Sequence, residues 1–425
     1  MYIISTIILD INLIQVKNII SASKLLNGVV DKTPMLRNLN LSERYDAEIF
    51  LKREDLQVVR SYKIRGAYNK IASLTEEEKI NGVVCASAGN HAQGVAYACR
   101  LLDIKGVIFM PTPTPKQKVK QVRSFGKEQV EIVLVGDTFD EAAKEAMNYC
   151  DKHKAAFIHP FDDIKVMEGQ ATVGLEILED ATDSIDYLIL PIGGGGLASG
   201  VSTYFKELSP TTKIIGVEPQ GAPSMKVSIE KGSVQTLDHI DKFVDGAAVQ
   251  RVGDKTFEIC REKVDRVITV PEGEVCTNIL QLYNEDAIVV EPAGALSITA
   301  LSQLASEIKG KRVVCVVSGG NNDIVRTAEI KERSMLFEGL KHYFMVSFPQ
   351  RSGALREFLV DVLGPTDDIT HFEYSKKNSR ERAPAVIGIE LLKREDFDKL
   401  IVRMGNKGFK YEHLNSKPEL FHYLI

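Results

Sequence analysis

Short runs of apolar residues alternate with helix-like patterns along the chain as far as residue 326. Six runs have the length and composition of buried strands: residues 82–86, 106–110, 156–159, 187–192, 214–218 and 312–317. Strands that alternate with helices form mainly parallel sheets covered by helices, so the pattern predicts an α/β fold. In such folds ligands bind beyond the carboxyl ends of the strands. Ser87, Gly193 and Ser318 each follow a predicted strand, and we expect them to meet at one site.

The pattern changes after Arg326, where a charged helix-like stretch runs through Glu332. Beyond it the predicted order is strand, helix, strand, strand, helix and strand, at residues 342–348, 353–362, 369–376, 385–392, 394–404 and 409–413. This βαββαβ order is that of a ferredoxin-like module. The sequence therefore predicts a separate C-terminal domain.

The composition is typical of a soluble enzyme. The 425 residues are 44% hydrophobic and 26% charged, which allows a sizeable core in two or three domains. A formal net charge of −5 gives nucleic acids and other polyanions no long-range attraction, so we expect a small ligand. Residues 2–14 are apolar, but Asp10 interrupts them and the run is too short to span a membrane.

The cysteines are scattered without a Cys-x-x-Cys pair, which indicates neither a zinc site nor a disulfide framework, and we assign no metal site. They are Cys85, Cys99, Cys150, Cys260, Cys276 and Cys315. Free thiols fit a reducing compartment, and we expect the protein to be cytoplasmic.

Four consecutive glycines, at positions 193, 194, 195 and 196, follow an apolar run and precede a helix-like stretch from Leu197. We call residues 193–196 the glycine segment. Bare glycine amides at a helix N-terminus can surround a phosphate group. The segment leaves the ligand open, because Gly193, Gly195 and Ala198 also fit a relaxed dinucleotide fingerprint, with Glu218 as its acidic residue.

A lysine upstream decides between these ligands. Lys63 lies in Ser61-Tyr62-Lys63-Ile64-Arg65-Gly66-Ala67 at the start of a predicted helix, with Ser61 available as its cap. Partial burial, the nearby cation of Arg65 and the positive end of the helix would each lower the pKa of Lys63. A nucleophilic lysine together with a phosphate site indicates pyridoxal phosphate.

Two further segments end predicted strands. Ser87-Ala88-Gly89-Asn90-His91 begins a helix-like run, where backbone amides can receive a carboxylate such as that of an amino acid. Ser318 opens Ser318-Gly319-Gly320-Asn321. Taken alone, each of these segments could equally be a simple turn or helix cap.

Together these segments, in this order and over nearly the whole chain, resemble the threonine dehydratases. That family belongs to the fold type II pyridoxal phosphate enzymes, so the resemblance implies a tryptophan synthase β-like, two-lobed catalytic domain over residues 1–330, with a smaller lobe at about 56–154. One departure is Tyr62, where relatives commonly carry phenylalanine. Both side chains offer an aromatic ring to the cofactor.

The resemblance also implies a role for each motif residue. Lys63 would hold the cofactor covalently and then act as the catalytic base that removes the α-proton. The other implied cofactor-binding residues are Tyr62, Asn90, Gly193, Gly194, Gly195, Gly196, Leu197 and Ser318. The implied substrate-binding residues are Ser87, Gly89, Asn90 and His91. A serine at position 318 would bind the pyridine nitrogen without protonating it, which favours expulsion of a β-leaving group over transamination.

The implied reaction is the conversion of L-threonine to 2-oxobutanoate and ammonia, the first step of isoleucine biosynthesis. Residues 331–425 resemble the single ACT-type regulatory domain of the short biosynthetic enzymes, with Pro349-Gln350-Arg351-Ser352-Gly353-Ala354-Leu355 as its ligand-binding turn. This resemblance implies inhibition by isoleucine, possible relief by valine, and a homotetramer or dimer. A plain oligomerisation module is the alternative for this domain.

Three other functions remain open from the sequence. A catabolic serine/threonine dehydratase or serine racemase would share every cofactor motif. A nicotinamide dehydrogenase would explain the glycines but not Lys63 or Ser318, and an amino-acid-sensing protein would need only the C-terminal domain. Glu291, in Val290-Glu291-Pro292, and the segment His159-Pro160-Phe161-Asp162 are candidates for the site without an assigned role.

Overall fold

The computed structural model describes residues 13–349, 351–374 and 382–417, so most of the apolar opening at residues 2–14 lies outside the described residues. The described residues form two compact units. The first runs through Glu272 and then from Leu282 to Asn322, and the second comprises Gly273–Gln281 and the residues from Asp323 on. No helix of the described residues is long and apolar enough to cross a membrane.

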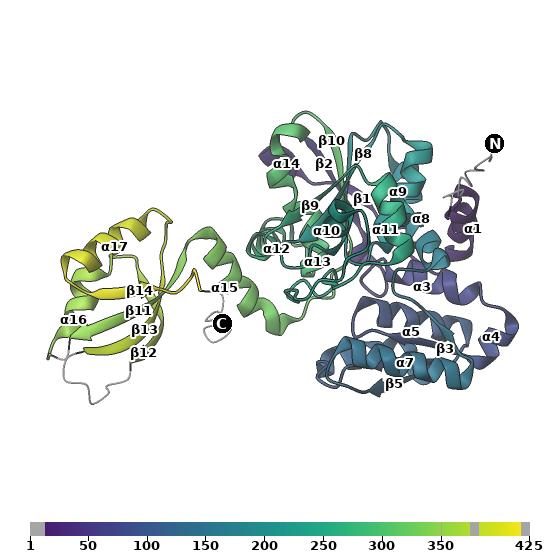
Figure 1. The fold of residues 1–425 in the computed structure, drawn as a ribbon. Helices are drawn as coiled ribbons and strands as arrows, with labels where there is room; N and C mark the ends of the chain where they lie inside the picture. Colours follow the sequence, from purple (N-terminus) through teal and green to yellow (C-terminus); the bar gives the residue numbers. More distant parts are fainter. Residues whose placement is uncertain (1–12, 350, 375–381, 418–425) are drawn as a thin grey trace, which may run out of the picture. The chain divides into compact units, whose positions relative to one another are not determined.

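The first unit contains two sheets (Figure 1). The larger has the strand order β1 (Met35–Arg37), β2 (Glu48–Arg53), β10 (Arg312–Val317), β7 (Tyr187–Pro191), β8 (Lys213–Pro219) and β9 (Arg266–Val270). The smaller has the order β5 (Val130–Leu134), β4 (Gly106–Met110), β3 (Val83–Ala86) and β6 (Ala156–Phe157). All neighbouring strands are parallel except β1, which pairs antiparallel with β2. The predicted two-lobed, mainly parallel α/β architecture is confirmed.

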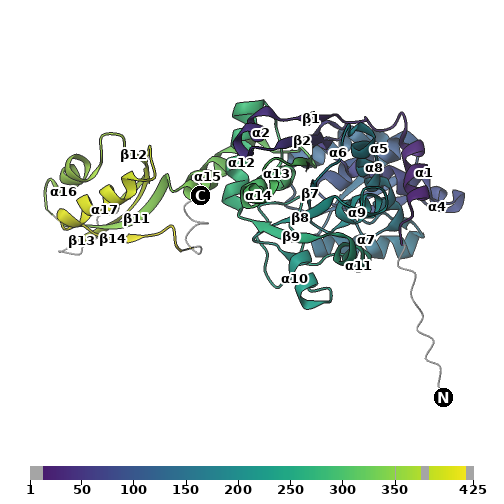
Figure 2. The same cartoon turned by 90° about the horizontal axis from the view of Figure 1, so that it is seen from above.

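Helices pack around the sheets of the first unit, and those beside the larger sheet can be followed in the second view (Figure 2). Those of the first unit are α1 (Val16–Leu26), α2 (Leu39–Tyr45), α3 (Lys63–Ala72), α4 (Glu76–Asn81), α5 (Asn90–Leu102), α6 (Lys116–Gly126), α7 (Phe139–His153), α8 (Ile164–Asp180), α9 (Gly196–Leu208), α10 (Ser224–Lys231), α11 (Asp254–Lys263), α13 (Pro292–Thr299) and α14 (Leu301–Ile308). Short 3₁₀ turns follow β2 (Glu54–Leu56) and α6 (Lys127–Gln129). Helix α12 (Glu272–Asp286) is divided between the units: Gly273–Gln281 belong to the second unit and its other residues to the first.

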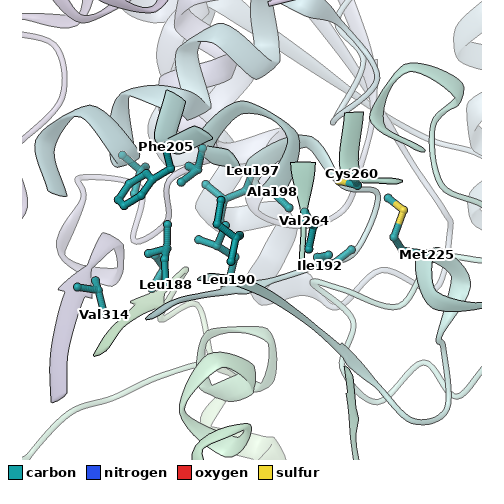
Figure 3. Packing of buried hydrophobic residues seen from close by; sticks show 14 of the residues in the cluster. Leu188, Leu190, Ile192, Leu197, Ala198, Phe205, Met225, Cys260, Val264 and Val314 are labelled. Atoms are coloured by element: carbon teal, nitrogen blue, oxygen red, sulfur yellow. The ribbon is translucent and has the colours of Figure 1, made fainter. Parts of the chain in front are cut away.

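The core of the larger lobe lies between its sheet and helices α8, α9 and α11. Leu188 and Leu190 of β7 and Val314 of β10 point toward Leu197 and Phe205 of α9 (Figure 3). All five side chains are at most 2% exposed. Because Leu197 directly follows the glycine segment, its burial fixes where that segment leaves the sheet.

The second unit is a four-stranded antiparallel sheet covered by helices. Its elements are a 3₁₀ turn (Ile324–Arg326), α15 (Thr327–Glu338), β11 (Lys341–Pro349), α16 (Ala354–Glu357), a π turn (Phe358–Val362), β12 (Asp368–Tyr374), β13 (Arg382–Glu390), α17 (Asp396–Asn406) and β14 (Lys410–His413). The strand order β12-β13-β11-β14 is that of a ferredoxin-like module and confirms the βαββαβ prediction. Gln350, in the predicted ligand-binding turn, lies outside the described residues.

The strand prediction missed β1, β2, β5 and β9. Of these, β2 has the sequence Glu-Ile-Phe-Leu-Lys-Arg, which ends in two cations. Lys52 is nevertheless fully buried, and its Nζ donates to Glu176 Oε2 on α8 at 2.6 Å. A buried cation is tolerated only when a partner neutralises it. Here the partner lies 124 residues away in the chain, so no local pattern reveals the strand.

Arg65, the third residue of α3, belongs to the same buried network of charges as Lys52. Its guanidinium pairs with Glu54 at 2.8 Å and with Glu176 at 2.6 Å, and both it and Glu54 are 0% exposed. Burial alone would raise the pKa of Glu54, but the charge and hydrogen bonds of Arg65 hold it below its ordinary value. The two cations and two carboxylates of this network join α3, β2, the turn after β2, and α8.

We expect Arg65→Met to lower the free energy of unfolding by about 3–5 kcal/mol, because it leaves two buried carboxylates with a single cation. Urea denaturation of the purified full-length chain measures the change. The control is Arg261→Met, which removes an exposed pair with Glu258 on α11 and should cost less than about 1 kcal/mol. Equal effects of the two changes would contradict the importance of the network.

Candidate active site

The three predicted segments do meet in the first unit. The backbone N–H of Tyr62 donates to the carbonyl oxygen of Ser318 at 3.2 Å, which joins the lysine segment to the end of β10. The Asn321 amide donates to Asn90 Oδ1 at 2.6 Å, which joins the same strand end to the start of α5. Lys63 Nζ donates to the carbonyl oxygen of Pro160, and the ring of the next residue, Phe161, packs on Gly194, which brings the glycine segment beside the lysine segment. The convergence expected from the strand ends is therefore observed.

Lys63 is the first residue of α3, and its Nζ donates to the carbonyl oxygen of Pro160 at 2.8 Å. Burial lowers the pKa of Lys63 to about 8, against the opposing effect of the Glu291 carboxylate. A lysine with this pKa is a far better nucleophile and base at neutral pH than an exposed lysine.

Two predictions about the surroundings of Lys63 are wrong: the cap by Ser61 and the effect of Arg65 on the pKa. Ser61 does not cap α3: the N-cap is Tyr62, without a side-chain cap, and Ser61 Oγ is buried and has no hydrogen-bond partner among the described residues. Arg65 does not lower the pKa of Lys63, because its own charge is neutralised by Glu54 and Glu176. Burial is the main cause of the shift.

The glycine segment has no space for side chains. A Cβ at Gly194 would lie 2.2 Å from the ring of Phe161, and a Cβ at Gly193 would lie 2.9 Å from Ala247 Cα. Gly195 has a φ of +93°, which side-chain-bearing residues rarely adopt, and it is the N-cap of α9. The segment therefore needs glycine for packing as well as for access of its amides to an anion at the helix N-terminus.

The glycine segment is also held by a hydrogen bond from helix α11. Thr256 Oγ1 donates to the carbonyl oxygen of Gly194 at 2.6 Å. Asp162 accepts from the backbone N–H groups of Asp254, Lys255 and Thr256, and so caps α11. Asp162 thus has a structural role, because it holds the start of α11 and with it Thr256.

The segment Ser87-Ala88-Gly89-Asn90-His91 forms a tight turn into α5. Gly89 is the N-cap, and its N–H donates to Ser87 Oγ at 3.2 Å. Asn90 is the first helical residue, and its Nδ2 donates to Glu291 Oε1 at 2.6 Å. The first N–H groups of a helix have no partner within it, so this turn can receive an anionic group.

The His91 side chain is engaged by the protein backbone. Its Nε2 lies 2.8 Å from the carbonyl oxygen of Ile158, which can only accept, so Nε2 carries the proton. Burial lowers the pKa of His91 to about 3, and the nearby Lys63 charge adds to this effect. The ring is therefore neutral, and the backbone N–H of His91 is the group left for the expected carboxylate contact.

Ser318 directly follows β10, is 3% exposed, and donates to the carbonyl oxygen of Ala293 at 3.3 Å. This long bond leaves the hydroxyl free to turn toward a better acceptor. Tyr62 lies beside Lys63, whose Nζ is 5.3 Å from the centre of the tyrosine ring. Burial raises the pKa of the Tyr62 hydroxyl, so the ring is neutral.

Glu291 is the site residue to which the sequence assigned no role. It is 5% exposed and holds Asn90, while its own N–H donates to the carbonyl oxygen of Gly319 at 3.2 Å. Burial raises its pKa to about 7, and the charge of Asp245 adds to the shift. The only sequence signal was its position before Pro292, which marks the start of α13 but says nothing of the site.

Two candidates have structural partners instead. His159 Nδ1 accepts from the N–H groups of Phe161 and Asp162 at 3.2 and 2.8 Å, and burial lowers its pKa to about 4. Glu218 is 0% exposed and accepts from the N–H groups of Met225 and Lys226, so it caps α10. Both oxygens of Glu218 are thus engaged, which argues against the dinucleotide alternative, where they would bind a ribose.

Two family models match the chain. Residues 26–319 match the model described as "Pyridoxal-phosphate dependent enzyme". Residues 332–424 match the model described as "C-terminal regulatory domain of Threonine dehydratase".

Curated relatives match almost from end to end. A biosynthetic L-threonine dehydratase IlvA of Halalkalibacterium halodurans is 59% identical over 412 residues, which cover 97% of this chain and 99% of the relative. The corresponding enzyme of Bacillus subtilis is 58% identical over 414 residues, which cover 97% of this chain and 98% of the relative.

Two solved structures match about three quarters of the chain. The processed form of threonine deaminase isoform 2 from Solanum lycopersicum has a TM-score of 0.71 at 38% identity, over 75% of this chain and 94% of its own. A serine racemase from Dictyostelium discoideum has a TM-score of 0.68 at 33% identity, over 73% of this chain and 100% of its own.

We expect Gly194→Ala to lower the free energy of unfolding by about 1–3 kcal/mol, because the new Cβ overlaps the Phe161 ring. Urea denaturation measures the change, and Gly405→Ala on α17, where a Cβ meets nothing within 4 Å, is the control. Phe161→Ala removes the ring, so in the double variant the two costs should be less than additive. Additive costs would show that the ring is not what excludes a side chain.

Proposed function

Because the chain belongs to the pyridoxal-phosphate dependent enzymes, and is a threonine dehydratase by its near full-length relatives, we propose that it converts L-threonine to 2-oxobutanoate and ammonia by eliminating water. The observation that carries this proposal is a buried lysine, whose pKa burial lowers to about 8, beside a glycine segment at the N-terminus of α9. This reaction fits the first step of isoleucine biosynthesis.

The residues of the site fit the cofactor. Pyridoxal phosphate presents an aldehyde to an amine, a phosphate to N–H donors and a pyridine nitrogen to a hydroxyl. Lys63, the glycine segment at the N-terminus of α9, and Ser318 offer these three groups in one site. When bound, the cofactor supplies an electron sink for the electrons of the substrate Cα–H bond.

The proposed roles of the individual residues follow from their contacts. Lys63 would hold the cofactor and, once freed, take the α-proton on Nζ. With a pKa of about 8, about one lysine in ten is unprotonated at pH 7, against fewer than about one in a thousand at the ordinary pKa. Tyr62 and Leu197 would flank the cofactor, and Asn90 would bind its ring oxygen in an orientation that Glu291 and Asn321 hold.

The substrate carboxylate would bind at the turn into α5. Ser87, Gly89, Asn90 and the backbone N–H of His91 are the proposed donors. A carboxylate is stabilised at a helix N-terminus by the unpaired amides there and by the helix dipole. The carboxylate would then bind at the start of α5 and the phosphate at the start of α9.

We also propose that catalysis and regulation are carried out by different regions of the chain. We assign catalysis to residues 1–330, with the smaller lobe at about 56–154, and regulation to residues 331–425. The assembly of the chain as a homotetramer or dimer stays a prediction. The cytoplasm is the proposed location, supported by six buried cysteine thiols that form no disulfide.

Lys63→Ala is expected to reduce 2-oxobutanoate formation by at least about a thousandfold while leaving the folded structure intact, because it removes the only proposed base. The assay uses the purified full-length chain saturated with pyridoxal phosphate. Lys70→Ala, on the same helix but paired with Asp163 near the surface, is the matched control and should keep its activity. Substantial turnover by Lys63→Ala would refute the assignment.

A second candidate function is the conversion of serine, favoured by the likeness to a serine racemase structure. Relative turnover of L-serine and L-threonine, together with formation of D-serine, separates the two. Faster reaction with serine would favour the catabolic dehydratase or the racemase.

Isoleucine should inhibit the enzyme through the second unit, with valine as a possible antagonist. In the proposed ligand-binding turn, Gly353 has a φ of +84° and open space around it. Gly353→Val should raise the isoleucine concentration for half-inhibition about tenfold, because a side chain there disfavours the turn by about 1–2 kcal/mol. Gly408→Val, with a φ of +68° and similar open space in the same unit, is the control. An equal loss of response in both variants would point to general destabilisation, and no response in the unaltered chain would contradict regulation by isoleucine.

A further inference from the structure

Gln170 is a buried polar residue that the proposed mechanism does not use. It lies on α8 and is 0% exposed. Neither Nε2 nor Oε1 of its amide has a hydrogen-bond partner among the described residues. An unpaired buried polar group costs about 1–3 kcal/mol, so two on one side chain call for a partner outside the protein.

The amide lies directly behind the glycine segment. A Cβ on Gly196 would come within 2.6 Å of Gln170 Oε1. Gly196 is the first residue of α9, where helical N–H groups have no partner within the helix. Gln170 also packs against α3, the helix that begins with Lys63: a Cβ on Gly66 would lie 3.0 Å from Gln170 Cγ.

The charged neighbours of Gln170 on α8 are already paired. Glu168 accepts from Asn18 and Lys165, and Glu176 from Lys52 and Arg65. The amide is therefore the uncommitted polar group on this stretch of α8, and it is next to an anion site. A neutral N–H donor is suited to a phosphate oxygen, since it adds a charge-assisted hydrogen bond without a second buried charge.

We propose that Gln170 is a further phosphate-binding residue. A half-turn of its unpartnered amide would exchange Oε1 for Nε2 beside Gly196, and Nε2 then donates to the cofactor phosphate held at the glycine segment, directly or through one water molecule. This inference rests on the proposed function, because it takes pyridoxal phosphate as the occupant of the site. It also gives α8 a contact with the ligand, so that α3, α8 and α9 are held together at the site when the phosphate is bound.

The test compares binding of pyridoxal phosphate and of pyridoxal, which lacks the phosphate, to the full-length chain after removal of bound cofactor. Spectroscopic titration gives both dissociation constants. We expect Gln170→Met to weaken pyridoxal phosphate binding about tenfold to a hundredfold, the loss of one hydrogen bond to a charged group. Binding of pyridoxal should change less than about twofold.

Gln93→Met is the matched control, because Gln93 is also buried and its Oε1 is also unpartnered, but it lies on α5 and its Nε2 donates to Gln121. It should alter neither constant. If Gln170→Met does not fold, the same comparison with Gln170→Asn, which keeps the amide but shortens its reach, decides the matter.

An equal weakening of both ligands, or no change in either, would overturn the proposal and leave Gln170 with a structural water. Failure of the unaltered chain to bind either ligand would instead refute the proposed function. The two failures are therefore distinguishable.

Discussion

The buried charge network of Arg65, Glu54, Glu176 and Lys52 is the constraint on which the position of the reactive lysine depends. It joins α3, which begins with Lys63, to strand β2 of the larger sheet and to α8. Charges in a protein interior are tolerated only in such neutral, fully hydrogen-bonded sets. The network therefore selects one arrangement of α3 against the sheet, and with it one position for the Lys63 amine.

Once α3 is fixed, burial sets the chemistry of its first residue. The Lys63 amine has one close hydrogen bond, to the carbonyl oxygen of Pro160, and sits in surroundings that disfavour its charge. The same chain segment continues to Phe161, whose ring covers the glycine segment, and to Asp162, which caps α11. One short loop thus links the lysine, the anion site and the helix that supports it.

Much of the fold was readable from local pattern. Strands β4 and β10 begin and end at the predicted residues, and the whole ferredoxin-like order of the second unit was predicted. These segments are recognisable because they are continuous apolar runs or regular alternations. Strand β2 was missed because Lys52 is typical of a surface segment, and Glu176, the carboxylate that allows Lys52 to be buried, is remote in sequence.

The sequence by itself determined the α/β architecture, the separate C-terminal module and the set of segments that form the site, since these depend on hydrophobic periodicity and on short motifs of neighbouring residues. Only the tertiary structure decided which polar groups are engaged. Arg65 is neutralised, Ser61 caps nothing, the His91 ring is neutral, and the amide of Gln170 is left without a partner. Protonation and hydrogen bonding depend on groups that packing brings together from distant parts of the chain, and no local pattern contains them.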